Sequence, residues 1–123
     1  MSVLWFDGLL TRLDDAGVYF LPESDLEELL EAAAVNRFPT LRVNLAGCSG
    51  KADLLLRLGL DNLPDAPGLV LLLEHSEQLR RAAPADFKTA MEVLQAASRE
   101  WAGRERPLWT FIAMSDGEFD ALP

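Results

Sequence analysis

The sequence predicts an α/β protein with a small, mostly parallel β-sheet flanked by helices. Short strand-like segments alternate with longer segments of helical periodicity, and parallel neighbouring strands need such helical crossovers. In addition, residues 69–73 are apolar at every position. This pattern is typical of a strand that helices cover on both faces. We therefore expect residues 69–73 to lie in the middle of the sheet.

An extra strand and helix are predicted at the N-terminal side of this sheet. Residues 17–22 form the strand, which ends at a proline. Residues 24–27 have the sequence Ser-Asp-Leu-Glu of a capping box, in which the Ser24 hydroxyl accepts from the backbone amide three residues on. Apolar residues then recur at helical spacing, so we expect an amphipathic helix that displays its acidic side chains, among them Asp25, to solvent.

The next strand and helix are predicted from alternation and from helical spacing. Residues 41–45 alternate apolar and polar side chains as a half-buried strand does. Ser49 or Gly50 opens a helix, and its buried stripe is Leu54, Leu55 and Leu58. The prolines and the glycine of the segment that follows indicate a loop.

A long helix and a final strand complete the predicted elements. Pro84 suits the first turn of the helix, because an amide hydrogen is not needed there, and Gly103 suits its end. Residues 107–113 are rich in aromatic and apolar side chains and form the last strand. Residues 116–120 are expected to be frayed.

Length and composition indicate a single domain over residues 1–123. With 123 residues, half of them hydrophobic at 50%, the chain can bury one core of its own. Its longest apolar run, residues 69–73, is far shorter than the roughly 20 residues that cross a membrane. The first residues show no secretory signal, and Cys48 is the only cysteine, so a reducing compartment fits. We expect the cytoplasm.

The charge of the chain is strongly negative. Its 20 acidic and 11 basic residues give a formal net charge of −9. Such a chain repels nucleic-acid phosphates and anionic lipids, so we expect neither nucleic acid nor a membrane as partner. The same charge attracts basic proteins over long range. It also serves solubility, so the charge alone does not identify a function.

The motifs that could support catalysis are incomplete. Residues 47–51, Gly-Cys-Ser-Gly-Lys, follow a strand and open a helix as a phosphate-binding loop does. Leu45 stands where that loop needs its first glycine, and Ala52 stands where it needs a hydroxyl. His75 and Cys48 are the sole residues of their types, too few for a structural zinc site. We expect no enzyme, no cofactor and no metal.

Several segments share residues and spacing with one known family. In the second half they include Gly-Leu-Val-Leu-Leu-Leu-Glu-His at 68–75, and also 84–87, 92–97, 100–102 and 106–109. In the first half they are 16–19, 42–47 and 51–55. On these segments the chain resembles the barstar family of ribonuclease inhibitors, including its N-terminally extended members. The resemblance implies a barstar-like fold and a bacterial inhibitor that places carboxylates in the basic, phosphate-binding cleft of a secreted ribonuclease.

One departure from the family concerns the inhibitory segment itself. Members carry an aromatic-Gly-x-Asn loop and an Asp-bearing helix before the central strand, where this chain has only residues 60–67. The segment is thus shortened. A family contact late on the long helix falls at Glu100, and the acidic position one turn earlier falls at Ala96. The resemblance therefore implies a remodelled partner-binding face around four polar residues: Asp61, Asn62, Asp65 and Glu100.

Three hypotheses about function follow. The first is an immunity protein that neutralises a protein toxin, a basic nuclease, through an acidic surface. The second is a barstar-like scaffold that has lost nuclease inhibition and serves another protein–protein interaction or forms a homodimer. The third is an enzyme that uses Lys51, Cys48 or Glu74.

Overall fold

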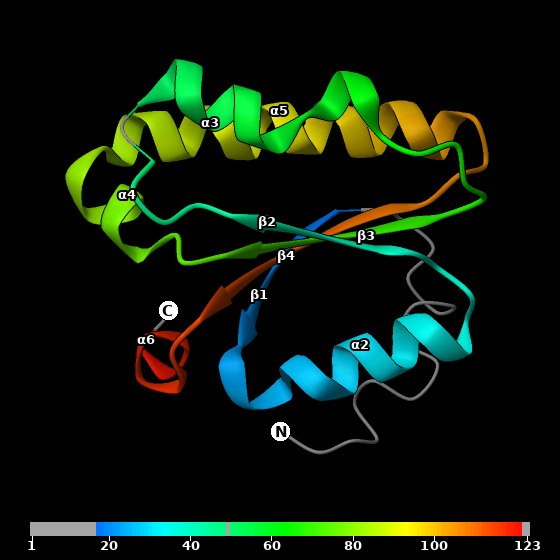
Figure 1. Cartoon of the computed structure of the whole chain (residues 1–123), viewed down its shortest axis with the longest axis horizontal. Coiled ribbons are helices and arrows are strands. Elements are labelled where there is room, and N and C mark those ends of the chain that lie inside the picture. Colours follow the sequence, from blue (N-terminus) through cyan, green and yellow to red (C-terminus); the bar gives the residue numbers. More distant parts are fainter. Residues whose placement is uncertain (1–16, 49, 122–123) are drawn as a thin grey trace.

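A four-stranded parallel β-sheet lies at the centre of the computed structural model, which describes residues 17–48 and 50–121 (Figure 1). The strands are β1 (Val18–Pro22), β2 (Thr40–Asn44), β3 (Leu69–Glu74) and β4 (Leu108–Met114). Their order across the sheet is β1-β4-β3-β2, and all three pairings are parallel. The predicted parallel sheet with flanking helices is confirmed.

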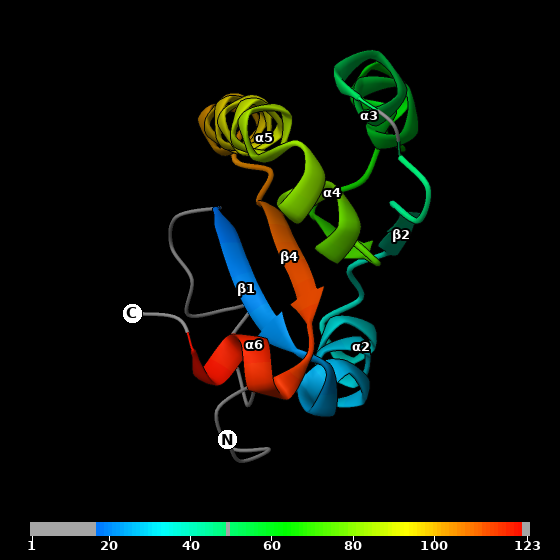
Figure 2. The same ribbon diagram turned by 90° about the vertical axis from the view of Figure 1, so that its left-hand side faces the viewer.

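Helices cover both faces of this sheet. They are α2 (Leu26–Val35), α3 (Lys51–Leu58), α4 (Glu77–Ala82), α5 (Pro84–Gly103) and α6 (Asp116–Asp120), with short 3-10 turns η2 (Glu23–Asp25) and η3 (Leu60–Asn62). Helices α3 and α5 lie side by side on one face, and α2 lies on the opposite face (Figures 1 and 2). The long helix begins and ends at the predicted residues.

Strand β3 contributes to two hydrophobic layers at once. Its odd-numbered residues pack with Leu54 and Leu94 beneath α3 and α5. Val70 and Leu72 pack on the other side with Leu29 and Ala33 of α2. Residues 69–73 are fully buried. The central position predicted for this segment is confirmed, and its uniformly apolar sequence follows because neither of its faces meets solvent.

The start of α2 differs from the predicted capping box. The turn η2 moves the N-cap position to Asp25, whose side chain makes no cap hydrogen bond. Ser24 instead donates its backbone amide to Asp116 Oδ1 at 3.1 Å. Asp25 is only 3% exposed, so the prediction that it points into solvent is also wrong.

The prediction that residues 116–120 are frayed is wrong, because these residues form α6. Ser115 is the N-cap, and its hydroxyl accepts from the Glu118 amide at 3.2 Å. Arg80 pairs with Glu118 at 2.9 Å and fixes α6 to α4. A short acidic segment without an apolar stripe gives no helical signal of its own, and this long-range ion pair was not visible in the local sequence.

The ion pair predicts that the docking of α6 depends on pH. The hydrogen bond from Arg80 holds the pKa of Glu118 below its ordinary value of 4.5, with further contributions from Ser115 and Arg81. A lowered pKa in the folded state stabilises the fold above the ordinary pKa, and this contribution is lost as pH falls through the lowered value.

We expect α6 to detach in acid, seen as a change in the Phe119 amide resonance between pH 5 and pH 2. In Arg80→Gln the transition should move to higher pH, because the main cause of the lowered pKa is gone. Coincident titrations of Glu118 in the two proteins would contradict this account.

Candidate functional site

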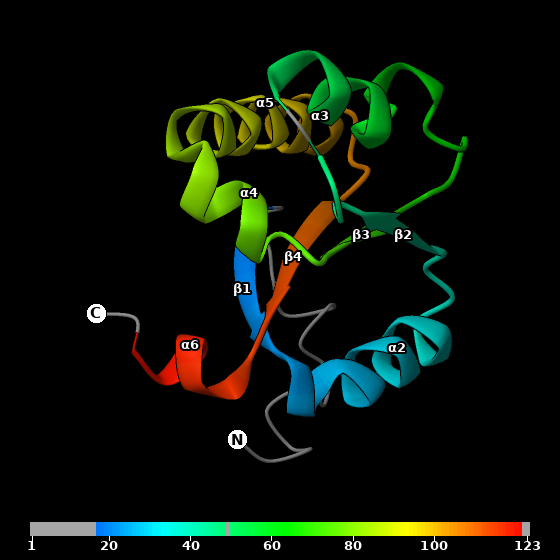
Figure 3. The ribbon, with the colours of Figure 1, turned by 60° about the vertical axis from the view of Figure 1, so that its left-hand side comes forward.

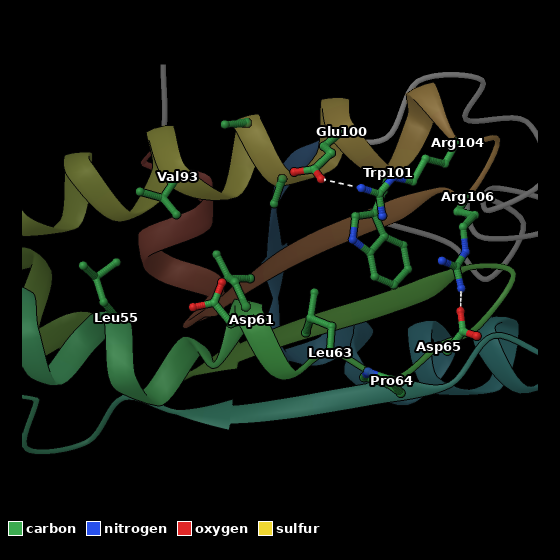
Figure 4. Close-up of a pocket in the computed structure, with 13 residues that line it drawn as sticks. Leu55, Asp61, Leu63, Pro64, Asp65, Val93, Glu100, Trp101, Arg104 and Arg106 are labelled. Atoms are coloured by element: carbon green, nitrogen blue, oxygen red, sulfur yellow. Dashed lines mark hydrogen bonds and ion pairs between the residues drawn. The ribbon is translucent and has the colours of Figure 1, made fainter.

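A groove of about 600 Å³ opens between α5 and the segment that joins α3 to β3 (Figure 4). One wall carries Leu55, Leu60 and Leu63, and the wall from α5 carries Val93 and Trp101. Both walls thus carry apolar side chains, and polar groups stand among them. Leu55 was predicted to be buried with its helix stripe, but it is partly exposed and lines this groove.

The shape of the groove follows from how α3 ends. Gly59 has φ 55, a left-handed conformation that glycine adopts without steric cost and that ends the helix. The single turn η3 follows, closed by a hydrogen bond from the Asn62 amide to the Gly59 carbonyl at 2.9 Å. Between Leu58 and Leu69 there is no α-helix. The connection therefore does not fill the space beside α5, and a recess remains.

Three of the four predicted partner-binding residues line this one groove. Asp61 and Asp65 come from the α3–β3 connection, and Glu100 comes from α5. Asn62 does not line it; it is exposed at the end of η3. The fold thus brings together carboxylates that lie far apart in the chain, while their role in binding stays a prediction.

Two of these carboxylates already have cationic partners. Glu100 pairs with Arg104 at 2.9 Å, one helical turn away, and Asp65 pairs with Arg106 (Figure 4). Within residues 17–48 and 50–121, no ion pair or hydrogen bond engages the Asp61 side chain. Three carboxylates and two guanidinium groups leave the groove with one excess negative charge. Asp61 is therefore its unpaired anion.

Arg106 holds the two walls of the groove together. Its Nε donates to the Ala66 carbonyl at 2.9 Å, and its guanidinium lies 5.2 Å from the centre of the Trp101 ring. A turn after α5 places the side chain there. In this turn the Arg106 amide donates a hydrogen bond to the Trp101 carbonyl at 2.9 Å. No local pattern in the sequence indicates this role, since Arg106 and Asp65 are 41 residues apart.

The incomplete catalytic motifs lie at the start of α3 and at the end of β3. Cys48 is buried, with its Sγ 3.9 Å from the Gly50 carbonyl, and Gly50 is the N-cap of α3. His75 is exposed beyond β3, and Ser49 lies outside the described residues. In the described ranges, no group of three His, Cys, Asp or Glu side chains could hold a metal ion.

Across residues 17–48 and 50–121, no helix combines the length and the apolar character that a membrane span requires.

Comparisons with known proteins were made for the whole chain. A family model described as Barstar (barnase inhibitor) matches residues 58–113. The match begins at the end of α3, spans the groove segment, β3, α4 and α5, and ends within β4. Neither the curated proteins nor the solved structures gave a match.

The geometry around Arg106 predicts that it stabilises the groove. We expect Arg106→Ala to lower the free energy of unfolding by about 1–2 kcal/mol, because it removes a charged hydrogen bond and a cation–π contact. Urea unfolding monitored by tryptophan fluorescence measures the change. Arg104→Ala is the matched control: Arg104 is 61% exposed in an i,i+4 pair, and its loss should cost no more than about 0.5 kcal/mol. Equal losses in the two variants would refute a structural role for Arg106.

Proposed function

This chain belongs to the barstar family, and from that premise we propose that it is a non-catalytic immunity protein that binds and neutralises a nuclease-type toxin. Members of the family are ribonuclease inhibitors, so the scaffold is one that blocks an enzyme by occupying it. The observation that carries the proposal is the groove within the matched segment, where Asp61, Asp65 and Glu100 converge.

Asp61 is the proposed first contact with the toxin. A ribonuclease cleft presents arginine and lysine side chains that bind phosphate, and an unpaired carboxylate can accept the same charge-assisted hydrogen bonds. Asn62 stands beside it, exposed and able both to donate and to accept.

Asp65 and Glu100 would join by exchanging partners. Their side chains are 91% and 64% exposed, and exposed ion pairs contribute little to stability. A cation from the toxin can therefore replace Arg106 or Arg104 at small cost. The half-buried Trp101 and its apolar neighbours would exclude water around these contacts, where electrostatic interactions become stronger.

The shortened connection gives the proposed interface a concave shape. Where other members present a helix, this chain presents a recess between η3 and α5. A recess accepts a projecting segment, so we expect the toxin to insert a basic loop into the groove. The net charge of −9 would speed the encounter with such a basic partner.

The binding test uses barnase, the enzyme in the family description, and the product of any nuclease-like gene that is found beside the gene for this chain. The chain should bind at one to one and suppress nuclease activity. Asp61→Asn should weaken binding about tenfold, the effect of losing one charge-assisted hydrogen bond of about 1.5 kcal/mol or more.

Glu31→Gln is the matched control. It removes the same charge from an exposed position on α2, across the sheet from the groove, and should leave affinity unchanged. Failure of the wild-type chain to bind or inhibit either enzyme would refute the proposed function.

Exposed leucines favour a second candidate, self-association. Leu56 on α3 is 79% exposed and adjoins Leu55 at the rim of the groove. If this surface joins two copies, the wild-type chain should sediment as a dimer at micromolar concentration and Leu56→Ser as a monomer. Val35→Ser, which removes an equally exposed residue from α2, should remain dimeric. A monomeric wild-type chain would rule this candidate out.

A further inference from the structure

We propose a second binding site, a pocket that receives the guanidinium group of an arginine side chain from a basic protein. The pocket, of about 320 Å³, lies where β1 and β4 end. It is lined by Pro22, Ser24, Asp25, Asp116, Phe119 and Asp120. Helix α6 and the turn η2, which precedes α2, form its sides. Both α6 and α2 lie away from α3 and α5, which cover the other face of the sheet (Figures 1 and 3). It is thus separate from the groove.

Asp25 is the residue that points to a ligand. It lines the pocket, is only 3% exposed, and its Oδ2 is buried with no hydrogen-bond partner. Burial of a carboxylate oxygen without a donor is costly. A cationic donor that enters the pocket would remove this cost, so the site suits a group that residues 17–48 and 50–121 do not supply.

The remaining walls add negative charge and an aromatic face. Asp116 and Asp120 lie one turn apart on α6, and Asp116 Oδ1 accepts from the Ser24 amide at 3.1 Å, which ties α6 to the turn before α2. Among the described residues, no ion pair neutralises Asp25, Asp116 or Asp120. The neighbouring Arg80 is engaged by Glu118 instead. The pocket therefore holds three carboxylates without cations.

The chemistry of these walls suits a guanidinium group better than a metal ion. In the part of the chain that the structure describes, no three carboxylates are placed to hold a metal. A guanidinium is larger and planar, and its five donors can reach carboxylates on both α6 and η2. It also stacks on an aromatic ring such as that of Phe119. An arginine of a basic partner fits because the net charge of −9 attracts such proteins.

The experiment titrates the full chain with N-acetylargininamide, which presents one guanidinium on a neutral backbone. Two-dimensional amide spectra should show saturable shifts at Ser24, Asp25, Asp116 and Phe119. Asp25→Asn should bind about tenfold more weakly or worse, because a charge-assisted hydrogen bond is lost. Glu31→Gln, with the same change of charge outside the pocket, should bind as the wild type does.

Further measurements separate the proposal from general attraction of cations. N-acetyllysinamide, which has the same charge but no planar fork, should bind more weakly. Non-saturable shifts, equal binding by Asp25→Asn and wild type, or equal binding of the two probes would each overturn the proposal. Should Asp25→Asn misfold, Asp120→Asn and Phe119→Leu replace it with the same expected loss. These results do not depend on nuclease binding, so the two proposals can fail separately.

Discussion

The double-sided burial of β3 is the constraint on which the rest of the structure depends. Because neither face of this strand meets solvent, α3 and α5 must cover one side and α2 the other. The fully buried residues of β3 are all apolar, and both candidate sites lie where strands or helices end. The groove lies beyond the end of α3, and the acidic pocket lies beyond the ends of β1 and β4.

The entry to β3 also fixes one wall of the groove. A Cβ at Gly68 would lie 2.5 Å from a ring carbon of Phe38, so only glycine allows this close approach without a shift of the ring. Phe38 itself packs edge-on against Trp109, with ring centres 5.0 Å apart. The chain must therefore pass this point in one way, and Arg106 holds the preceding residues Asp65 and Ala66 against α5. The packing of Phe38 and the contacts of Arg106 together position this wall of the groove.

The fold could be predicted to a large extent because its main signals are local. Uniform apolarity identified β3, and Pro84 and Gly103 marked the bounds of α5. The errors concern long-range partners. The amide of Ser24 bonds to Asp116, 92 residues away, and α6 depends on Arg80. A capping pattern or an acidic tail contains no information about such contacts.

The candidate site could also be predicted in part, here from the resemblance to a family. The resemblance to a family placed Asp61, Asp65 and Glu100 near one another, and the packing of α3 beside α5 brings them to one groove. Sequence could not show that two of them are paired within the chain, since Arg106 reaches Asp65 only through the turn after α5.

The ion pairs of Asp65 and Glu100 reduce the negative charge that the groove can offer to a partner. A net charge of −9 suggests a uniformly acidic binding surface, but the groove carries only one excess negative charge, and the pocket beside α6 carries three unpaired carboxylates. Long-range attraction depends on the total charge, whereas the contact itself depends on which carboxylates lack a partner. In the groove a cation from a partner must displace an arginine or pair with Asp61. We expect this requirement to favour partners that also contact the apolar side chains of the groove. In the pocket a cation meets no competing cation from residues 17–48 and 50–121. For the two proposed sites, we therefore expect the distribution of internal cations, more than the number of acidic residues, to set the selectivity.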